Sequence, residues 1–436
     1  MTNVKNYLVF VIPSVLAFAL SGVYTIVDGF FIGHSMGDVG IAAVTIGYPV
    51  CVLIQAIGTG VGLAGSIRYT ILGAQNKEEK MKECFTSTSI LMVLLSVILT
   101  VVLYLAAGWM MAVLGSTGEM HAMATEYVCV IAVGTMCQLL ATGFVPFIRN
   151  MGGARYAMVA MILGFVMNIV LDYVLVWKME AGMAGAAWAT VIGQALTMAA
   201  ALIFFVYKKC PLPLSKPTEM FRLWLRLLKV AISPFGLTFS STLTLLFMNR
   251  FLLSYGSDLD VAIFGCIDYV FCIIYMLLQG VGDGSQPLVS DAYGAGNMSG
   301  VKNLRMMAYR FAFALSLVFL VGVFLARGYM GPLFGASDEA TTGVVYYLPW
   351  FLATLLFLCF SRITTTYLYA TEQVGYSYVL VYGEPLLTLA LLFVLPLIMP
   401  EGMELTGVWL AMPAAQVMNC LIAIVLKQIV DKKMHE

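Results

Sequence analysis

The chain has 436 residues, of which 61% are hydrophobic and only 11% are charged. Soluble domains carry about 25% charged residues, so a chain of this composition could not cover its own surface in water and a soluble globular protein is excluded. The formal net charge is zero, and without a basic field the chain is not expected to bind nucleic acid.

Long apolar runs follow one another along the whole chain. A membrane-spanning helix needs about 20 mostly apolar residues, and it must satisfy its own backbone because lipid offers no hydrogen bonds. The sequence therefore predicts an all-α integral membrane protein with twelve transmembrane helices, including a first run too long for a signal peptide. The twelve runs lie at 7–33, 40–66, 85–107, 123–147, 157–178, 184–207, 230–255, 261–287, 306–326, 341–370, 378–399 and 405–426.

The positions of lysine and arginine predict the orientation of these helices. With an even number of helices both termini share one side, and 19 of the 23 cations fall on that side. Of the other four, Lys178 and Arg327 fall on the opposite side, and Arg250 and Arg362 lie within helices. Cytoplasmic loops carry the excess of positive charge, so we expect both termini to be cytoplasmic and the protein to lie in the cell (inner) membrane.

The two halves of the sequence resemble each other. At an offset of about 221 residues, Pro13 aligns with Pro234, and the segment "LGAQN" at 72–76 aligns with "YGAGN" at 293–297. Such repeats are common in transporters. We therefore expect a six-helix lobe at 1–207, a cytoplasmic linker at 208–229 and a second six-helix lobe at 230–436. Because each half has six helices, a pseudo-twofold axis along the membrane normal should relate the two bundles, with a substrate path between them.

Polar residues inside the first six helices form a candidate ion site. Asp28 lies in the first helix, Asn168 and Asp172 lie one turn apart in the fifth, and Thr190 lies in the sixth. Counted from the helix ends at 1.5 Å per residue, Asp28, Asp172 and Thr190 reach a similar depth in the outer half of the membrane. An ionisable group at such a position is a functional candidate because its burial is costly.

The chemistry of this set suits cation or proton coupling. Carboxylate, amide and hydroxyl oxygens are ligands for a hard cation such as Na⁺, and two neighbouring carboxylates can instead exchange a proton in coupled steps. A hydrogen-bonded cluster that only joins helices is the structural alternative. Pro13 removes a backbone hydrogen bond from the first helix and is expected to kink it.

The second half does not repeat this set, because Asn249 takes the place of Asp28 and apolar residues take the places of the others. It carries ionisable groups of its own. Unpaired charges would be costly there, so we expect the pairs Arg250–Asp268 and Arg362–Glu384, with a structural, substrate or proton role. No phosphate-binding loop is present, and no cofactor or enzymatic activity is expected.

Several segments are similar to those of the multidrug and toxic compound extrusion (MATE) family. They are "IVDGFFIGH" at 26–34, "GAQNKEE" at 73–79, "FIRNMGGARYAM" at 147–158, "MNIVLDYVLVW" at 167–177 and "GMAGAAWATVIGQ" at 182–194. The resemblance implies two six-helix lobes and drug export driven by inward Na⁺ or H⁺ flow. It implies a cation site at Asp28, Asn168, Asp172 and Thr190, and a bendable first helix at Pro13.

Together these observations predict a monomeric secondary antiporter that exports small organic compounds, often cationic and amphipathic, in exchange for Na⁺ or H⁺. A flippase for a lipid-linked precursor is one alternative, although it would need more cations in the spans than Arg250 and Arg362. A receptor or channel is another, but two repeated lobes with an acid pair in only one of them favour alternating access.

Overall fold

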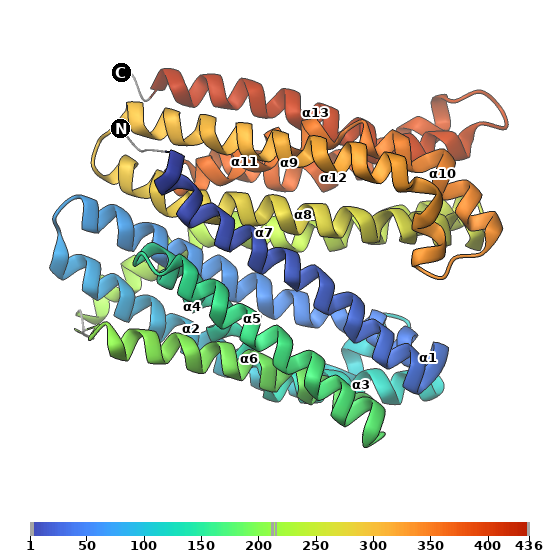
Figure 1. Cartoon of the computed structure of the whole chain (residues 1–436), viewed down its shortest axis with the longest axis horizontal. Coiled ribbons are helices and arrows are strands. Elements are labelled where there is room, and N and C mark those ends of the chain that lie inside the picture. The colour runs from blue at the N-terminus through green and yellow to red at the C-terminus, as the bar shows by residue number, and fades with distance from the viewer. Residues whose placement is uncertain (1–3, 211–212, 214–215, 434–436) are drawn as a thin grey trace. The chain divides into compact units, whose positions relative to one another are not determined.

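The computed structural model describes residues 4–210, 213 and 216–433. In this part of the chain every regular element is a helix (Figure 1). The elements are α1 (Val4–Ala74), α2 (Glu78–Val113), α3 (Gly118–Val133), α4 (Thr135–Asn150), α5 (Ala154–Leu171), η1 (Asp172–Lys178), α6 (Gly182–Tyr207), α7 (Pro217–Tyr255), α8 (Asp258–Gly294), α9 (Met298–Leu333), α10 (Asp338–Leu352), α11 (Leu355–Ala370), α12 (Val374–Ile398) and α13 (Glu404–Lys433).

The first helix, α1, consists of two spanning arms, Val4–Gly37 and Val39–Ala74. The backbone leaves the helical region at Gly37, where φ is 62° and ψ is −157°. A positive φ is readily adopted by glycine because it has no Cβ. The outer loop expected between the first two helices is therefore a turn centred on a single residue.

Two further spans are each broken in the middle. The axes of α3 and α4 meet at 57°, and those of α10 and α11 meet at 49°. With each bent pair taken as one span, the described residues contain twelve helices long and apolar enough to cross a membrane. This confirms the predicted all-α class with twelve spans. Several helices extend beyond their apolar runs, and α8 continues through Pro287 to Gly294.

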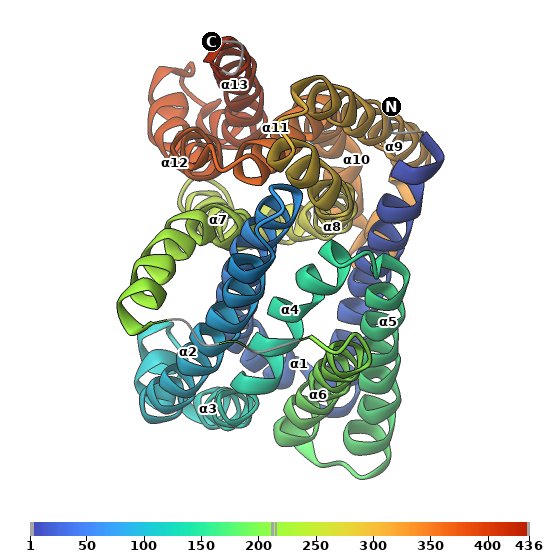
Figure 2. The same ribbon diagram turned by 90° about the vertical axis from the view of Figure 1, so that its left-hand side faces the viewer.

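The chain divides into two compact units, which we call the N-unit (residues 8–238 and 290–297) and the C-unit (residues 4–7, 239–289 and 298–433). Within the N-unit, α5 packs on α6, α4 packs on both, and α2 contacts α3 and α4. Within the C-unit, α12 and α13 pack together, α11 packs on both, and α9 contacts α10 and α11 (Figure 2). The two sets of pairs correspond one to one, which confirms the repeated six-helix arrangement.

Candidate functional site

Asp28 is positioned by the packing of the first arm of α1 against α5. One turn before Asp28, the ring of Tyr24 stacks on Phe165 with centroids 4.8 Å apart. Towards the end of the same arm, the His34 ring stacks on Trp177 of η1 at 4.5 Å. Contacts on both sides of Asp28 therefore hold its turn of the helix beside the end of α5.

Asn168 is positioned by a close approach of the backbones of α5 and α6. A Cβ built on Gly193 would lie 2.7 Å from the carbonyl oxygen of Gly164 and 3.2 Å from the Cβ of Asn168. Only a residue without a side chain fits there, and small residues are what allow spanning helices to approach this closely. Thr190, one turn before Gly193, then lies opposite Asn168.

The structure brings together all four residues of the predicted ion site. The amide of Asn168 satisfies its neighbours when its nitrogen donates to Asp172 Oδ2 at 3.2 Å and its oxygen accepts from the Thr190 backbone N–H at 3.2 Å. The amide also lies 3.4 Å from Thr190 Oγ1. The carboxyl groups of Asp28 and Asp172 are within hydrogen-bonding reach of each other. The hydrogen bond from Asn168 thus orients the Asp172 carboxyl group towards Asp28.

One oxygen atom of each carboxyl group in this pair makes no hydrogen bond within the described part of the chain. The Oδ1 atoms of Asp28 and Asp172 are both buried, and neither has a hydrogen-bond partner in the described part of the chain. Asp172 is 0% exposed, whereas Asp28 and Thr190 are half-buried. Two carboxylates in contact repel each other unless a proton or a cation lies between them. The oxygen atoms of this set therefore suit the binding of a proton or a small monovalent cation. Such an ion would reach the site from the side of Asp28.

A π-helical turn begins at Asp172, which the sequence did not predict. In η1 the Met179 N–H donates to the Val174 carbonyl, five residues back, at 2.9 Å. Such turns are rare and occur frequently at functional sites. The wider turn ends α5 at the carboxylate and places Trp177 beside His34, near the end of the first arm of α1.

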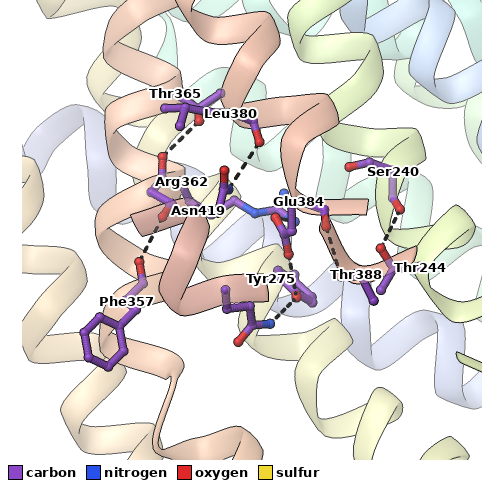
Figure 3. A network of polar contacts seen from close by, with 12 residues as sticks. Ser240, Thr244, Tyr275, Phe357, Arg362, Thr365, Leu380, Glu384, Thr388 and Asn419 are labelled. Carbon is purple, nitrogen blue, oxygen red and sulfur yellow. Dashed lines mark hydrogen bonds and ion pairs between the residues drawn. The ribbon is translucent and has the colours of Figure 1, made fainter. Parts of the chain in front are cut away.

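In the C-unit a second polar network surrounds Glu384 (Figure 3). Arg362 Nη2 of α11 lies 3.8 Å from Glu384 Oε2 of α12. The Tyr275 hydroxyl of α8 donates to Glu384 Oε1 at 3.3 Å, and the Arg362 guanidinium lies 4.5 Å from the centre of the Tyr275 ring. Arg362 and Glu384 therefore form the predicted pair, and Tyr275 holds both charged groups.

The network continues to the break between α10 and α11. Gln416 of α13 donates from Nε2 to the Tyr275 hydroxyl at 3.1 Å, and the Thr354 hydroxyl, located at the break, donates to Gln416 Oε1. Tyr275, Gln416 and Thr354 were not among the predicted residues. The available signal was spacing, because Asp268 and Tyr275 lie two turns apart on one face of α8.

The predicted pair Arg250–Asp268 does not form. Arg250 is exposed and Asp268 is half-buried, and no ion pair within 4.0 Å joins these two described residues. The prediction failed because α8 begins at Asp258, earlier than the expected 261. Asp268 therefore lies about 15 Å along its helix, whereas Arg250 lies about 8 Å from the end of α7. The two side chains are at different depths.

Around Pro13 the backbone of α1 keeps helical dihedral angles, since Gly37 is the one non-helical position in α1. The ring nonetheless removes one N–H donor from the helix at this position. A bend at Pro13 during transport stays a prediction.

A repeated six-helix unit with broken fourth spans, and an acid pair between the first and fifth spans, agrees with the family resemblance noted above. The MatE family model matches residues 13–174 and 234–394, and the chain belongs to this family. The two matched stretches begin at 13 and 234, which reproduces the offset of the internal repeat.

Known proteins are similar along nearly the whole chain. The multidrug export protein MepA of Staphylococcus aureus (strain MSSA476) is 25% identical over 434 residues, which covers 97% of this chain and 93% of MepA. A solved MOP superfamily transporter from Pyrococcus furiosus superposes with a TM-score of 0.91 at 20% identity, covering 99% of this chain and 97% of that chain. A crystal structure of MATE in the straight conformation gives the same values. These structures establish the fold.

Proposed function

We propose that the protein is a secondary antiporter that exports small organic compounds in exchange for Na⁺ or H⁺, with its coupling site at Asp28 and Asp172. The observation that carries this proposal is the contact between two carboxyl groups inside the spans, each with an unpartnered buried oxygen. The name of the relative MepA, a multidrug export protein, supports export as the direction and several organic compounds as the substrates.

In this proposal the driving ion enters from outside and reaches Asp28 first, since Asp28 is more exposed than Asp172. A proton or Na⁺ between the two carboxyl groups removes their repulsion and draws the first arm of α1 towards α5. Release of the ion to the cytoplasm restores the repulsion and separates them. The ion therefore has a differential affinity for two conformations, which is what a coupling ion requires.

The flippase alternative fits the contacts less well. A lipid-linked pyrophosphate needs several cations available in the substrate path. Arg362, one of the two arginines predicted inside the spans, is engaged by Glu384 and Tyr275. This leaves Arg250 alone among the predicted intramembrane cations, which is too little charge to hold a pyrophosphate.

The test is efflux of an organic cation, such as ethidium, from proteoliposomes containing the purified protein. A Na⁺ gradient and a pH gradient are imposed separately, and empty liposomes are the control. We expect one of the two gradients to drive ethidium against its own concentration gradient. Transport that needs ATP, or that only runs downhill under both gradients, would show that the protein is not an antiporter.

A further inference from the structure

The N-unit contains a cavity that the proposed transport cycle does not use. Its volume is about 370 Å³. The lining comes from three helices (α1, α2 and α4) and from the residues that follow α4 and α6. The lining residues are Tyr69, Met81, Lys82, Phe85, Asn150, Met151, Lys208 and Cys210. All of them belong to the N-unit.

The cavity lies where spanning helices end. Asn150 is the last residue of α4, Lys208 directly follows α6, and Lys82 is in the second turn of α2. The ends of spanning helices lie in the headgroup layer of a bilayer rather than in its hydrocarbon core. The cavity is therefore at headgroup depth, on the side that the lysine and arginine positions predict to be cytoplasmic.

The polar part of the lining is positively charged. Lys82 and Lys208 both line the cavity, and the lining residues include no carboxylate. Lys82 also lies 3.6 Å from Glu78, but the Glu78 side chain is 76% exposed and the Lys82 side chain 38%. Such exposed pairs contribute little, so Lys82 remains available to an anion.

The rest of the lining is apolar and aromatic. Tyr69 and Phe85 meet edge to face, with ring centroids 6.5 Å apart, and two methionines complete the wall. Methionine adapts its shape to irregular apolar ligands. An occupant with an anionic head and an adjoining apolar part would satisfy both halves of the cavity.

A basic segment of α7 packs against α2, the helix that carries Lys82 and Phe85. The indole N–H of Trp224 donates to the carbonyl of Ser87 in α2 at 3.0 Å, two residues after Phe85, which fixes the first turns of α7 against α2. These turns carry Arg222, Arg226 and Lys229. Basic side chains beside a membrane surface attract anionic lipids.

We propose that this cavity binds the phosphate headgroup of an anionic phospholipid. Lys82 and Lys208 contact the phosphate, and the glycerol and first acyl carbons lie along Tyr69, Phe85 and the methionines. The bound lipid links the ends of α1, α2, α4 and α6. This proposal is independent of the antiport function, since it concerns lipid retention and not ion coupling.

Native mass spectrometry of the purified full chain tests the proposal. The wild type is exposed to dioleoylphosphatidylglycerol or to neutral dioleoylphosphatidylcholine, and retained lipids are counted. The double variant Lys82→Gln/Lys208→Gln is compared with Lys432→Gln/Lys433→Gln, which removes the same charge from an exposed end of α13. We expect the cavity variant to retain at least threefold less phosphatidylglycerol than the wild type and the control variant. Equal retention by the cavity variant, or equal retention of the two lipids by the wild type, overturns the proposal.

Cys210 gives a second measurement on the unmodified chain. Burial raises the pKa of the Cys210 thiol, although Lys208 opposes this effect, so alkylation by N-ethylmaleimide is followed at pH 8 on the Cys210 peptide. We expect slower alkylation in nanodiscs containing phosphatidylglycerol than in nanodiscs of phosphatidylcholine. The same rate in both overturns the proposal. Protection by millimolar inorganic phosphate in phosphatidylcholine nanodiscs, as strong as that by phosphatidylglycerol, overturns the assignment to a lipid in favour of a soluble phosphate.

Discussion

The N-unit and the C-unit repeat one arrangement of helices, but they differ in the groups that accompany their buried carboxylates. In the N-unit, Asp28 and Asp172 meet, and no cationic side chain of the described residues lies beside them. In the C-unit, Glu384 is accompanied by Arg362 and by the Tyr275 hydroxyl. A carboxyl pair without a counter-charge changes state when an ion arrives, whereas a compensated carboxylate has little reason to change. The duplicated scaffold thus separates a site suited to switching from a site suited to stability.

The largest expected effect follows from removing a charge in the N-unit. Asp172→Asn keeps the shape of the side chain but removes the carboxylate that a proton or Na⁺ requires. We expect gradient-driven efflux in proteoliposomes to fall to the background of empty liposomes, while ethidium binding in detergent stays near the wild-type affinity. The protein should fold, since a neutral amide costs less to bury than a carboxylate.

Asp258→Asn, at the exposed first residue of α8, is the matched control and should export like the wild type. If Asp172→Asn exports at the wild-type rate under every imposed gradient, Asp172 is a structural residue. The comparison between the two units would then lose its functional meaning.

The second effect concerns stability and should appear in the C-unit. Glu384→Gln leaves the Arg362 guanidinium buried without its carboxylate, and breaking a buried pair in this way costs about 3–5 kcal/mol. We expect a lower apparent melting temperature in detergent, followed by tryptophan fluorescence. The double variant Glu384→Gln/Arg362→Gln should melt closer to the wild type, because no charge is left uncompensated. Additive losses in the double variant would argue against an energetic coupling of the pair.

A smaller effect should follow from removing the Asn168 amide, which donates a hydrogen bond to Asp172. Asn168→Ala removes the amide that donates to Asp172 Oδ2, and an unsatisfied buried acceptor costs about 1–3 kcal/mol. We expect efflux to persist but to need a higher concentration of the driving ion. Asn419→Ala is the control, because Asn419 is equally buried in the C-unit and donates to the Leu380 carbonyl at 3.2 Å. The same shift in both variants would indicate a general loss of packing.

The mildest test uses substitutions that should leave transport intact. If both units enter the membrane from one side, Lys216→Cys before α7 is cytoplasmic and Glu180→Cys before α6 is external. We expect an impermeant maleimide to label Glu180→Cys in intact cells and Lys216→Cys only after permeabilisation. Both variants are compared on a background without other cysteines. The reverse pattern would invert the predicted orientation.

The sequence predicted the N-unit cluster because depth in a spanning helix can be counted. Asp28, Asp172 and Thr190 lie a similar number of residues from their outer helix ends, and the i, i+4 spacing placed Asn168 beside Asp172. The same counting failed for Arg250 and Asp268, because polar residues at the start of α8 extend the helix beyond its apolar run.

Other features depend on which residues meet in three dimensions. Tyr275 and Gln416 are ordinary helix residues in the sequence, and only the packing of α8, α12 and α13 makes them partners of Glu384. The π-helical turn after Asp172 also could not be predicted, because the apolar segment "DYVLVWK" reads as a continuation of the spanning α-helix. The break at Thr354 follows Pro349 by five residues, but a proline alone does not predict a break in this chain, because α8 continues through Pro287.

The π-helical turn after Asp172 has a consequence for how this segment tolerates changes in length. A π turn holds one residue more than an α turn, so the segment from Tyr173 to Trp177 contains one residue beyond what a continuous α-helix needs. Deleting one of these residues could restore α-helical hydrogen bonding without opening the backbone. Because the wider turn absorbs the extra residue, the residues beyond the deletion would keep nearly their present direction around the helix axis, and Trp177 would stay beside His34. The same deletion in a continuous α-helix would rotate everything beyond it by about 100°. The segment after Asp172 is therefore a place where the chain should tolerate the loss of one residue while keeping the contact between His34 and Trp177.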